Sequence, residues 1–256
     1  MKIKMAQQVK KILSENSFLY RLLSKIYHSG DKLWLPKQKP LEEILESYSH
    51  FKNDVFFIQI GSNDGVEADP INKYINQYNW QGLLVEPVTY LFERLKRNYS
   101  SKQHNLIFEN SAISNNDGEA SFYRLKVEND PNLPRWYHTI GSFNKEIILK
   151  HKKNISNFDD LLIEEKIKTI SLDTLLLKHN IENVDLIEID TEGYDFEIIK
   201  LINFNKLKID IIIFEHIHLT TSDYKKSIKL IKRNGFKLFA YKENTIGIRK
   251  NYYSGN

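Results

Sequence analysis

The chain has 256 residues, of which 41% are hydrophobic, enough for one sizeable α/β domain with an appendage or for two small domains. It contains no cysteine, which excludes disulfides, thiolate metal sites and cysteine nucleophiles and suits a reducing, cytoplasmic compartment. Its 37 basic and 33 acidic residues are mixed along the chain, so the net charge of +4 does not indicate a nucleic-acid partner, and no apolar stretch reaches the length of a membrane span.

Residues 1–50 are predicted to form an N-terminal helical extension. Between Val9 and Tyr27, apolar residues recur at three- and four-residue steps beside several basic residues, which is the pattern of a basic amphipathic helix. A second helix is expected from Pro40, with acidic residues in its first turn. Either these helices pack on the following domain or on a second copy of the chain in a homo-oligomer, or residues 1–30 dock on an anionic membrane surface.

Residues 51–256 are predicted to form one α/β domain, because short apolar runs alternate with helical segments. The expected central strands are residues 54–60, 82–87, 105–113, 184–190 and 209–216. Continuous apolar strands separated by helices indicate a mostly parallel sheet covered on both faces. The last two apolar runs, 236–241 and 245–250, are close enough to be antiparallel, which adds a reversed strand to the sheet edge.

The segment GSNDG, residues 61–65, lies directly behind the first expected strand, where open α/β sheets bind ligands. Its two glycines permit a close backbone approach, and Asn63 tolerates a left-handed conformation. A nicotinamide fingerprint would require glycine where Asn63 and Val66 stand, so dinucleotide binding is disfavoured. The next strand ends at Glu86, whose carboxylate can accept hydrogen bonds from both hydroxyls of a ribose.

Each of these features alone also fits a solvated loop or a solvated strand end. Their combination, in this order and spacing, favours a nucleoside cofactor without phosphates. S-adenosylmethionine is the common cofactor of this kind.

Five segments of the chain together resemble the FkbM-type S-adenosylmethionine-dependent methyltransferases: FFIQIGSNDG, WQGLLVEP, NSAISNNDG, TISLDTLL and VDLIEIDTEGYDFEIIK. The resemblance implies a class I methyltransferase (Rossmann-like) fold, with a mostly parallel seven-stranded sheet and one antiparallel edge strand. It also implies O-methylation, often of glycan sugars or of polyketide-like natural products. The cofactor residues that it implies are Gly61, Ser62, Asn63, Asp64 and Gly65 around the methionine part, Glu86 with Pro87 at the ribose, and Ser111 and Ala112 beside the adenine.

Two residues depart from the family pattern. Most members have an acidic residue where Gln59 stands, and many have lysine where Glu188 stands. Gln59 can still form hydrogen bonds but brings no charge, and Glu188 makes the end of the fourth strand unusually acidic. These departures leave open a degenerate methyltransferase fold that binds a partner without catalysis.

Methyl transfer to a hydroxyl requires alignment and a group that accepts the hydroxyl proton near the strand ends. The residues at the strand ends that could accept this proton are Asp190 and Glu192 after the fourth strand and Glu215, His216 and His218 after the fifth. The order of preference is Asp190, then His216, then His138. Regular strand alternation places Glu188 and Asp190 on one face, and together with Glu192 they form a candidate site for a divalent cation that acidifies the hydroxyl. A solvated or cofactor-contacting acidic edge is the alternative.

Residues 126–168 have no counterpart in a minimal nucleoside-binding fold and are predicted to be an acceptor-binding insertion. Aromatic rings flanked by hydrogen-bonding groups suit stacking on a sugar, although the same rings can instead anchor the loop to the core. The predicted substrate-binding residues are Arg135, Trp136, Tyr137 and Phe143 in this segment and Glu192 after the fourth central strand.

The sequence therefore predicts a cytoplasmic O-methyltransferase that acts on a hydroxyl of a sugar or glycan precursor, with peripheral membrane contact as an alternative location for its N-terminus. A small natural product or a lipid hydroxyl is the alternative acceptor. A catalytically inert binding module is the alternative of a different class.

Overall fold

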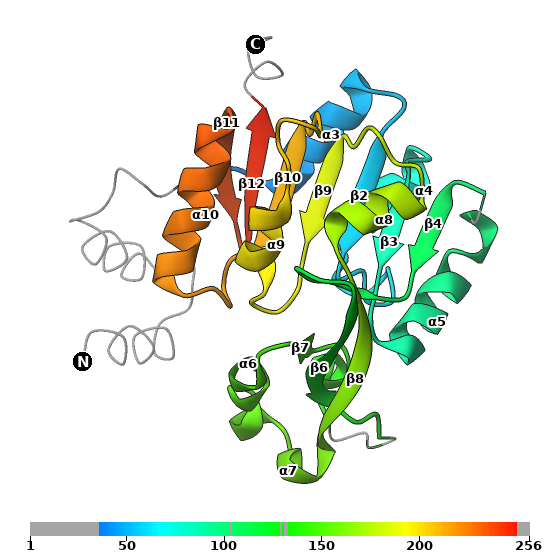
Figure 1. Cartoon of the computed structure of the whole chain (residues 1–256), viewed down its shortest axis with the longest axis vertical. Coiled ribbons are helices and arrows are strands. Elements are labelled where there is room, and N and C mark those ends of the chain that lie inside the picture. The colour runs from blue at the N-terminus through cyan, green and yellow to red at the C-terminus, as the bar shows by residue number, and fades with distance from the viewer. Residues whose placement is uncertain (1–35, 103, 129, 131–132, 250–256) are drawn as a thin grey trace. The chain divides into compact units, whose positions relative to one another are not determined.

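The computed structural model describes residues 36–102, 104–128, 130 and 133–249. The amphipathic helix predicted within residues 1–30 lies outside this part of the chain. In the described part, a large sheet carries helices on both faces, and a smaller sheet lies beyond one end of its strands (Figure 1). None of the described helices combines the length and the apolar composition that crossing a bilayer requires.

The large sheet has eight strands in the order β1-β11-β12-β10-β9-β2-β3-β4. Their bounds are Lys37–Gln38 (β1), Phe56–Ile60 (β2), Gln81–Val85 (β3), Leu106–Glu109 (β4), Leu186–Ile189 (β9), Ile211–Glu215 (β10), Phe236–Tyr241 (β11) and Asn244–Arg249 (β12). All neighbours pair in parallel except β12, which runs antiparallel to both β10 and β11. The predicted α/β class with a mostly parallel sheet is confirmed.

The number of strands and the position of the reversed strand differ from the prediction: the sheet has eight strands instead of seven, because the short β1 pairs with β11. β12 lies inside the sheet, between β10 and β11, and the two-residue strand β1 forms the edge beside β11. The interior position follows from burial, because residues 245–248 of β12 are all buried whereas Lys237 of β11 is exposed. Gly247 allows this tight fit: a Cβ there would lie 2.7 Å from Cγ2 of Ile212 on β10 and 3.1 Å from Cδ2 of Leu238 on β11.

Helices cover the large sheet on both faces, and one continuous apolar core fills the space on one side. The helices are Leu41–Phe51 (α3), Asn72–Gln77 (α4), Thr89–Asn98 (α5), Leu172–Lys178 (α8), Asp195–Leu201 (α9) and Thr221–Arg233 (α10). The core joins Leu45 of α3 and Leu95 of α5 to Phe57 of β2, with Trp80 fully buried among them. α8, α9 and α10 lie on the opposite face (Figure 1).

The smaller sheet orders its strands β5-β8-β6-β7. They are Ala112–Ile113 (β5), Gly118–Leu125 (β6), Gly141–Ser142 (β7) and Leu162–Ile170 (β8). Between β6 and β8 lie the helices Lys145–Leu149 (α6) and Phe158–Leu161 (α7) and the 3-10 turns Arg135–His138 (η2) and Lys152–Asn154 (η3), whereas the 3-10 turn Ser100–Lys102 (η1) follows α5. β6 and β8 are antiparallel along their whole length, from Gly118 opposite Thr169 to Leu125 opposite Leu162. This long hairpin carries the chain between them away from the large sheet and returns it (Figure 1).

The segment between β6 and β8 has an apolar core of its own. Leu125, Tyr137, Ile148 and Phe158 are buried together in it. A segment that buries its own apolar side chains can present a fixed surface to a ligand, unlike a loop held only at its ends.

Candidate active site

The carboxyl ends of the central parallel strands border a cavity of about 450 Å³, within the usual range of small-molecule sites. Of the predicted cofactor residues, it is lined by Gly61, Ser62, Asn63, Glu86, Pro87, Ser111 and Ala112. Of the predicted catalytic, substrate and metal residues, it is lined by Trp136, Phe143, Glu188, Asp190 and Glu192. Residues from five distant segments of the sequence thus face one space.

Glu86, directly after β3, accepts a hydrogen bond from the glycine-rich turn that follows β2. Its Oε2 accepts a hydrogen bond of 2.9 Å from the Asn63 N–H, and its Oε1 accepts one of 2.8 Å from the Val88 N–H. Asn63 adopts a φ of 51°, the left-handed conformation that its residue type tolerates. Burial raises the pKa of Glu86 to about 7, because the side chain is almost fully enclosed.

Gly61 brings the ends of β2 and β9 into direct contact. Its φ is +88°, and a Cβ there would lie 1.8 Å from the carbonyl oxygen of Asp190. The Gly61 N–H donates to the carbonyl of Val85, and the Asp190 N–H donates to the carbonyl of Ile60, both at 2.9 Å. The turn is therefore held on both sides, and any side chain at this position would separate the two strand ends.

Asp64 and Gly65, two predicted cofactor residues, do not line the cavity. Asp64 is buried and lies 2.7 Å from the Arg94 guanidinium, while its Oδ1 accepts hydrogen bonds from the N–H groups of Val66 and Glu67. At Gly65 a Cβ would lie 2.4 Å from the Tyr99 ring. Both residues shape the turn from behind.

An acidic wall of the cavity is formed by Glu188, Asp190, Glu192 and Glu215. Asp195 is fully buried outside the lining and accepts a hydrogen bond from the Thr191 hydroxyl of the same segment. Burial, reinforced by the charge of Asp190, raises the pKa of Asp195 to about 8 and that of Glu215 to about 11. Burial, together with the charge of Asp190, also raises the pKa of Glu188 well above its usual value. In the described part of the chain, no lysine or arginine forms an ion pair with Glu188, Asp190, Asp195 or Glu215.

The two histidines predicted as proton acceptors lie outside the cavity lining. The His216 ring stacks on Tyr224 at 4.8 Å between centroids, and its Nδ1 lies 3.1 Å from Oγ1 of Thr245. The Nε2 of His138 lies 2.9 Å from Nη1 of Arg94. Asp190, the first candidate, does line the cavity and exposes its side chain there.

His151 and His218 line the cavity in their place. Burial lowers the pKa of His218 to about 4, which keeps its ring neutral. His218 belongs to the strand-end residues that the sequence brings into consideration, but the preference there goes to His216. His151 is missed altogether, because its neighbouring lysines give the segment the pattern of a solvated face.

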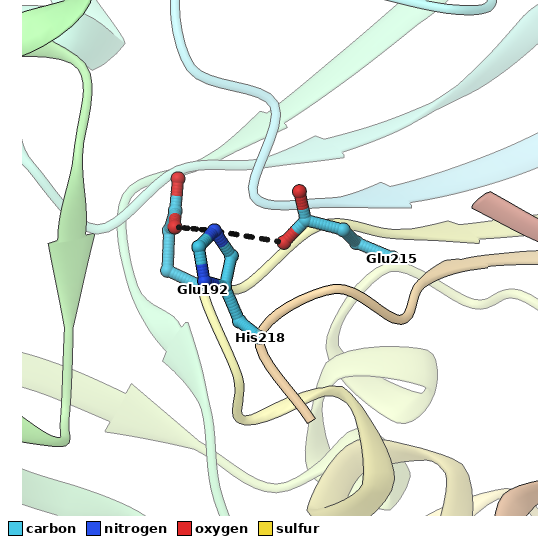
Figure 2. A group of neighbouring side chains, drawn as sticks. All are labelled: Glu192, Glu215 and His218. Atoms are coloured by element: carbon cyan, nitrogen blue, oxygen red, sulfur yellow. Dashed lines mark ion pairs between the residues drawn. The ribbon is translucent and has the colours of Figure 1, made fainter. Parts of the chain in front are cut away.

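The side chains that cluster most closely on the acidic wall are Glu192, Glu215 and His218 (Figure 2). One potential ligand atom from each lies within 4.8 Å of the others. The cation site predicted from the sequence consists of Glu188, Asp190 and Glu192, and only Glu192 belongs to the group found in the structure. Glu188 and Asp190 are not among the side chains whose potential ligand atoms lie within 4.8 Å of one another.

The insertion covers the cavity with aromatic side chains. Trp136 is 37% exposed, and Phe143 contacts Tyr194 with ring centroids 4.8 Å apart. Tyr137 is instead buried, and its hydroxyl bonds to the backbone of Glu128, so it anchors the loop. Arg135 lies in η2.

Two hydrogen bonds tie the insertion to the strand ends. The Asn63 side-chain amide donates to the Thr139 carbonyl at 3.2 Å, and the Ser142 hydroxyl donates to the Glu192 carbonyl at 2.9 Å. The glycine-rich turn, the acidic wall and the insertion are therefore connected directly around the cavity.

Comparisons with known proteins identify the family of the chain and structures that resemble its fold. The methyltransferase FkbM domain family matches residues 59–238. The structure is similar to that of the methyltransferase FkbM from Methylobacillus flagellatus KT, with a TM-score of 0.51 and 11% identity over 96% of this chain and 58% of that chain. An RNA methyltransferase from Salinibacter ruber, in complex with S-adenosyl-L-homocysteine, gives a TM-score of 0.41 and 8% identity over 84% of this chain and 92% of that one. No curated protein matches the chain.

The chain thus spans 58% of the length of the Methylobacillus protein. At this level of identity, the likeness between the two structures concerns the fold.

Proposed function

The chain belongs to the FkbM methyltransferase family, and from this premise we propose that it transfers the methyl group of S-adenosylmethionine to a hydroxyl of a sugar or glycan precursor. The observation that carries the proposal is the hydrogen bond from the Asn63 N–H to Glu86, which joins the glycine-rich turn to this acid in the lining of one cavity. The proposal has a cofactor half, an acceptor half and a chemical step.

In the cofactor half, Glu86 holds the ribose of the nucleoside. Each of its carboxylate oxygens already accepts one backbone hydrogen bond, and each keeps a second lone pair for a ribose hydroxyl. Ser111 and Ala112 line the cavity at the end of β4, beside the place for the adenine, and the hydroxyl of Ser111 has no hydrogen-bond partner in the described chain. Residues 61–63 border the place for the methionine part.

The charge of the cavity also suits this cofactor. S-adenosylmethionine carries a positive sulfonium and a positive ammonium group, and carboxyl groups such as Glu67 and Asp190 line the cavity. Opposite charges within a partly enclosed site attract strongly. The attraction weakens after transfer, because the sulfonium becomes a neutral thioether, and this favours product release.

In the acceptor half, the insertion within residues 126–168 supplies the recognition surface. Trp136, Phe143 and Ile217 line the cavity with apolar surface, while carboxyl groups nearby can accept hydrogen bonds from hydroxyl groups. A sugar ring offers both kinds of contact, because its C–H faces are apolar and its hydroxyl groups are donors. A small natural product or a lipid would use mainly the apolar surface, because it offers fewer hydroxyl donors than a sugar to these carboxyl groups.

In the chemical step, the acceptor oxygen attacks the methyl carbon in line with the sulfur. A C–O bond forms, the C–S bond breaks, and the hydroxyl proton passes to a nearby base. We assign that base to Asp190, which lies at the end of β9 with its side chain exposed in the cavity.

Calorimetric titration of the full chain with S-adenosylhomocysteine tests the cofactor half. Glu86→Gln should weaken binding at least about tenfold, because a carboxylate that accepts from two hydroxyls is replaced by an amide with one acceptor oxygen. Glu109→Gln is the matched control: Glu109 ends the neighbouring strand β4, but it pairs with Lys178 and does not line the cavity. Equal affinities in the two variants would contradict the assignment of Glu86, and no binding by the unmodified chain would favour the inert module.

Transfer of a labelled methyl group tests the acceptor. The chain is incubated with labelled S-adenosylmethionine and separate sets of sugar, lipid and small-phenol acceptors, and products are identified by mass. Methylated sugars are the expected product. Methylation of non-carbohydrate acceptors alone would overturn the assignment to sugars while leaving the methyltransferase activity intact.

A further inference from the structure

Three side chains at the ends of two adjacent strands converge on the acidic wall of the cavity (Figure 2). Glu192 follows β9, Glu215 is the last residue of β10, and His218 lies in the turn after it. The Nε2 atom of His218 is 3.0 Å from Oε2 of Glu192 and 3.8 Å from Oε2 of Glu215. The three potential ligand atoms therefore surround one small volume.

The carboxyl groups in this cluster lack the partners that buried acids require. Glu215 is only 7% exposed, and its Oε2 accepts no hydrogen bond. Oε2 of Glu192 also accepts none, although the imidazole nitrogen of His218 lies within reach. No lysine or arginine of the described chain forms an ion pair with either glutamate. Buried carboxylates are normally paired with a cation or coordinate a metal.

We propose that Glu192, Glu215 and His218 bind one divalent cation on the acceptor side of the cavity. Two carboxylate oxygens and one imidazole nitrogen form a mixed donor set that suits first-row ions such as Mn²⁺ or Zn²⁺. Three protein ligands leave further coordination positions open for water or a substrate oxygen, as in catalytic metal sites. The group is the only one of its kind in the described part of the chain.

The role of the cation rests on the function proposed above, whereas its binding does not. All three ligands line the cavity that Trp136 and Ile217 border. An acceptor hydroxyl bound to the cation would be more acidic, because the metal stabilises the oxygen as its proton leaves. That oxygen would then attack the methyl carbon as the C–S bond breaks, with the proton passing to Asp190.

Binding of Mn²⁺ alone to the full chain tests the proposal, with the signal of free Mn²⁺ followed by electron paramagnetic resonance. We expect one ion per chain, and Glu215→Gln and His218→Ala should each weaken binding at least about tenfold. Glu243→Gln is the control, because Glu243 also lines the cavity but lies outside the cluster, and its loss should change the affinity less than about threefold. Thermal unfolding of each variant shows that it remains folded.

Absence of Mn²⁺ binding at millimolar concentration would overturn the proposal. Binding that Glu243→Gln weakens as much as Glu215→Gln would also overturn it, since a diffuse negative potential rather than a coordination site would then hold the ion. Titration of the same samples with S-adenosylhomocysteine is independent of the metal. A chain that binds the nucleoside but not Mn²⁺ retains the proposed function and loses only the cation site.

Discussion

Replacement of Gly61 by alanine tests whether the strand ends that form the site meet as described. A Cβ at this position would lie 1.8 Å from the carbonyl oxygen of Asp190 and 2.8 Å from its carbonyl carbon. The turn cannot retreat freely, because backbone hydrogen bonds hold Gly61 to Val85 and Asp190 to Ile60. The ends of β2 and β9 must therefore separate to accept the methyl group.

Gly235 provides a matched control for the magnitude. It has the same φ of +88°, but a Cβ there meets nothing within 4 Å. Both variants carry the cost of a left-handed alanine, about 1–2 kcal/mol, and both gain equally from a stiffer unfolded chain. The clash adds a further cost of about 2–4 kcal/mol to Gly61→Ala alone.

Urea unfolding of both variants measures this difference, and titration with S-adenosylhomocysteine shows its effect on the site. We expect Gly61→Ala to lose both stability and nucleoside binding, whereas Gly235→Ala keeps its binding. Free energies of unfolding that agree within about 0.5 kcal/mol would refute the contact between the ends of β2 and β9.

Three further predictions concern the surroundings of the site. Raising the pH from 4.5 to about 7 should cost the folded state up to about 3 kcal/mol through Glu86 alone, because unfolded Glu86 ionises near 4.5 whereas the folded residue keeps its proton until about 7; Glu86→Gln should make this part of the pH profile of urea unfolding less steep by that amount, while the raised pKa of Asp195 maintains the rest of the slope. Tyr99→Phe should cost about 1 kcal/mol in the same assay, because the hydroxyl donates to the Gly65 carbonyl, and a loss no larger than that of Tyr78→Phe, whose hydroxyl bonds to Glu46 at the surface, would contradict this. Ser142→Ala should make the insertion easier to cleave in limited proteolysis, because it removes the bond to the Glu192 carbonyl, and an unchanged cleavage rate would show that other contacts hold the insertion.

Local sequence patterns predicted the parts of the fold that depend on neighbouring residues. α3 begins at Leu41, one residue after its predicted start at Pro40, and the glycine-rich turn follows β2 directly. The strands around Glu86 and Asp190 were recognisable because apolar runs ended there in polar residues. Since parallel strands end at a common edge, the sequence also predicted that these side chains would share one cavity.

The sequence was less informative where the chain leaves regular structure. β10 ends at Glu215, so strand alternation no longer determines the directions of His216 and His218. His151 reaches the cavity only because the insertion returns there, and its ring centroid lies 6.2 Å from that of His218. The interior place of β12 likewise depends on neighbours distant in sequence, because Gly247 fits between β10 and β11.

The two departures from the family pattern are neighbours in the structure. Gln59 of β2 lies directly opposite Glu188 of β9, and the side chains are 2% and 1% exposed. Burial and the charge of Asp190 raise the pKa of Glu188 well above its usual value, which favours its neutral form. Gln59 is neutral as well, so neither of these adjacent buried positions places an unpaired charge inside the sheet, where such a charge would be costly. The two strand ends can therefore pair in register beside the cavity, although both residues depart from the family pattern.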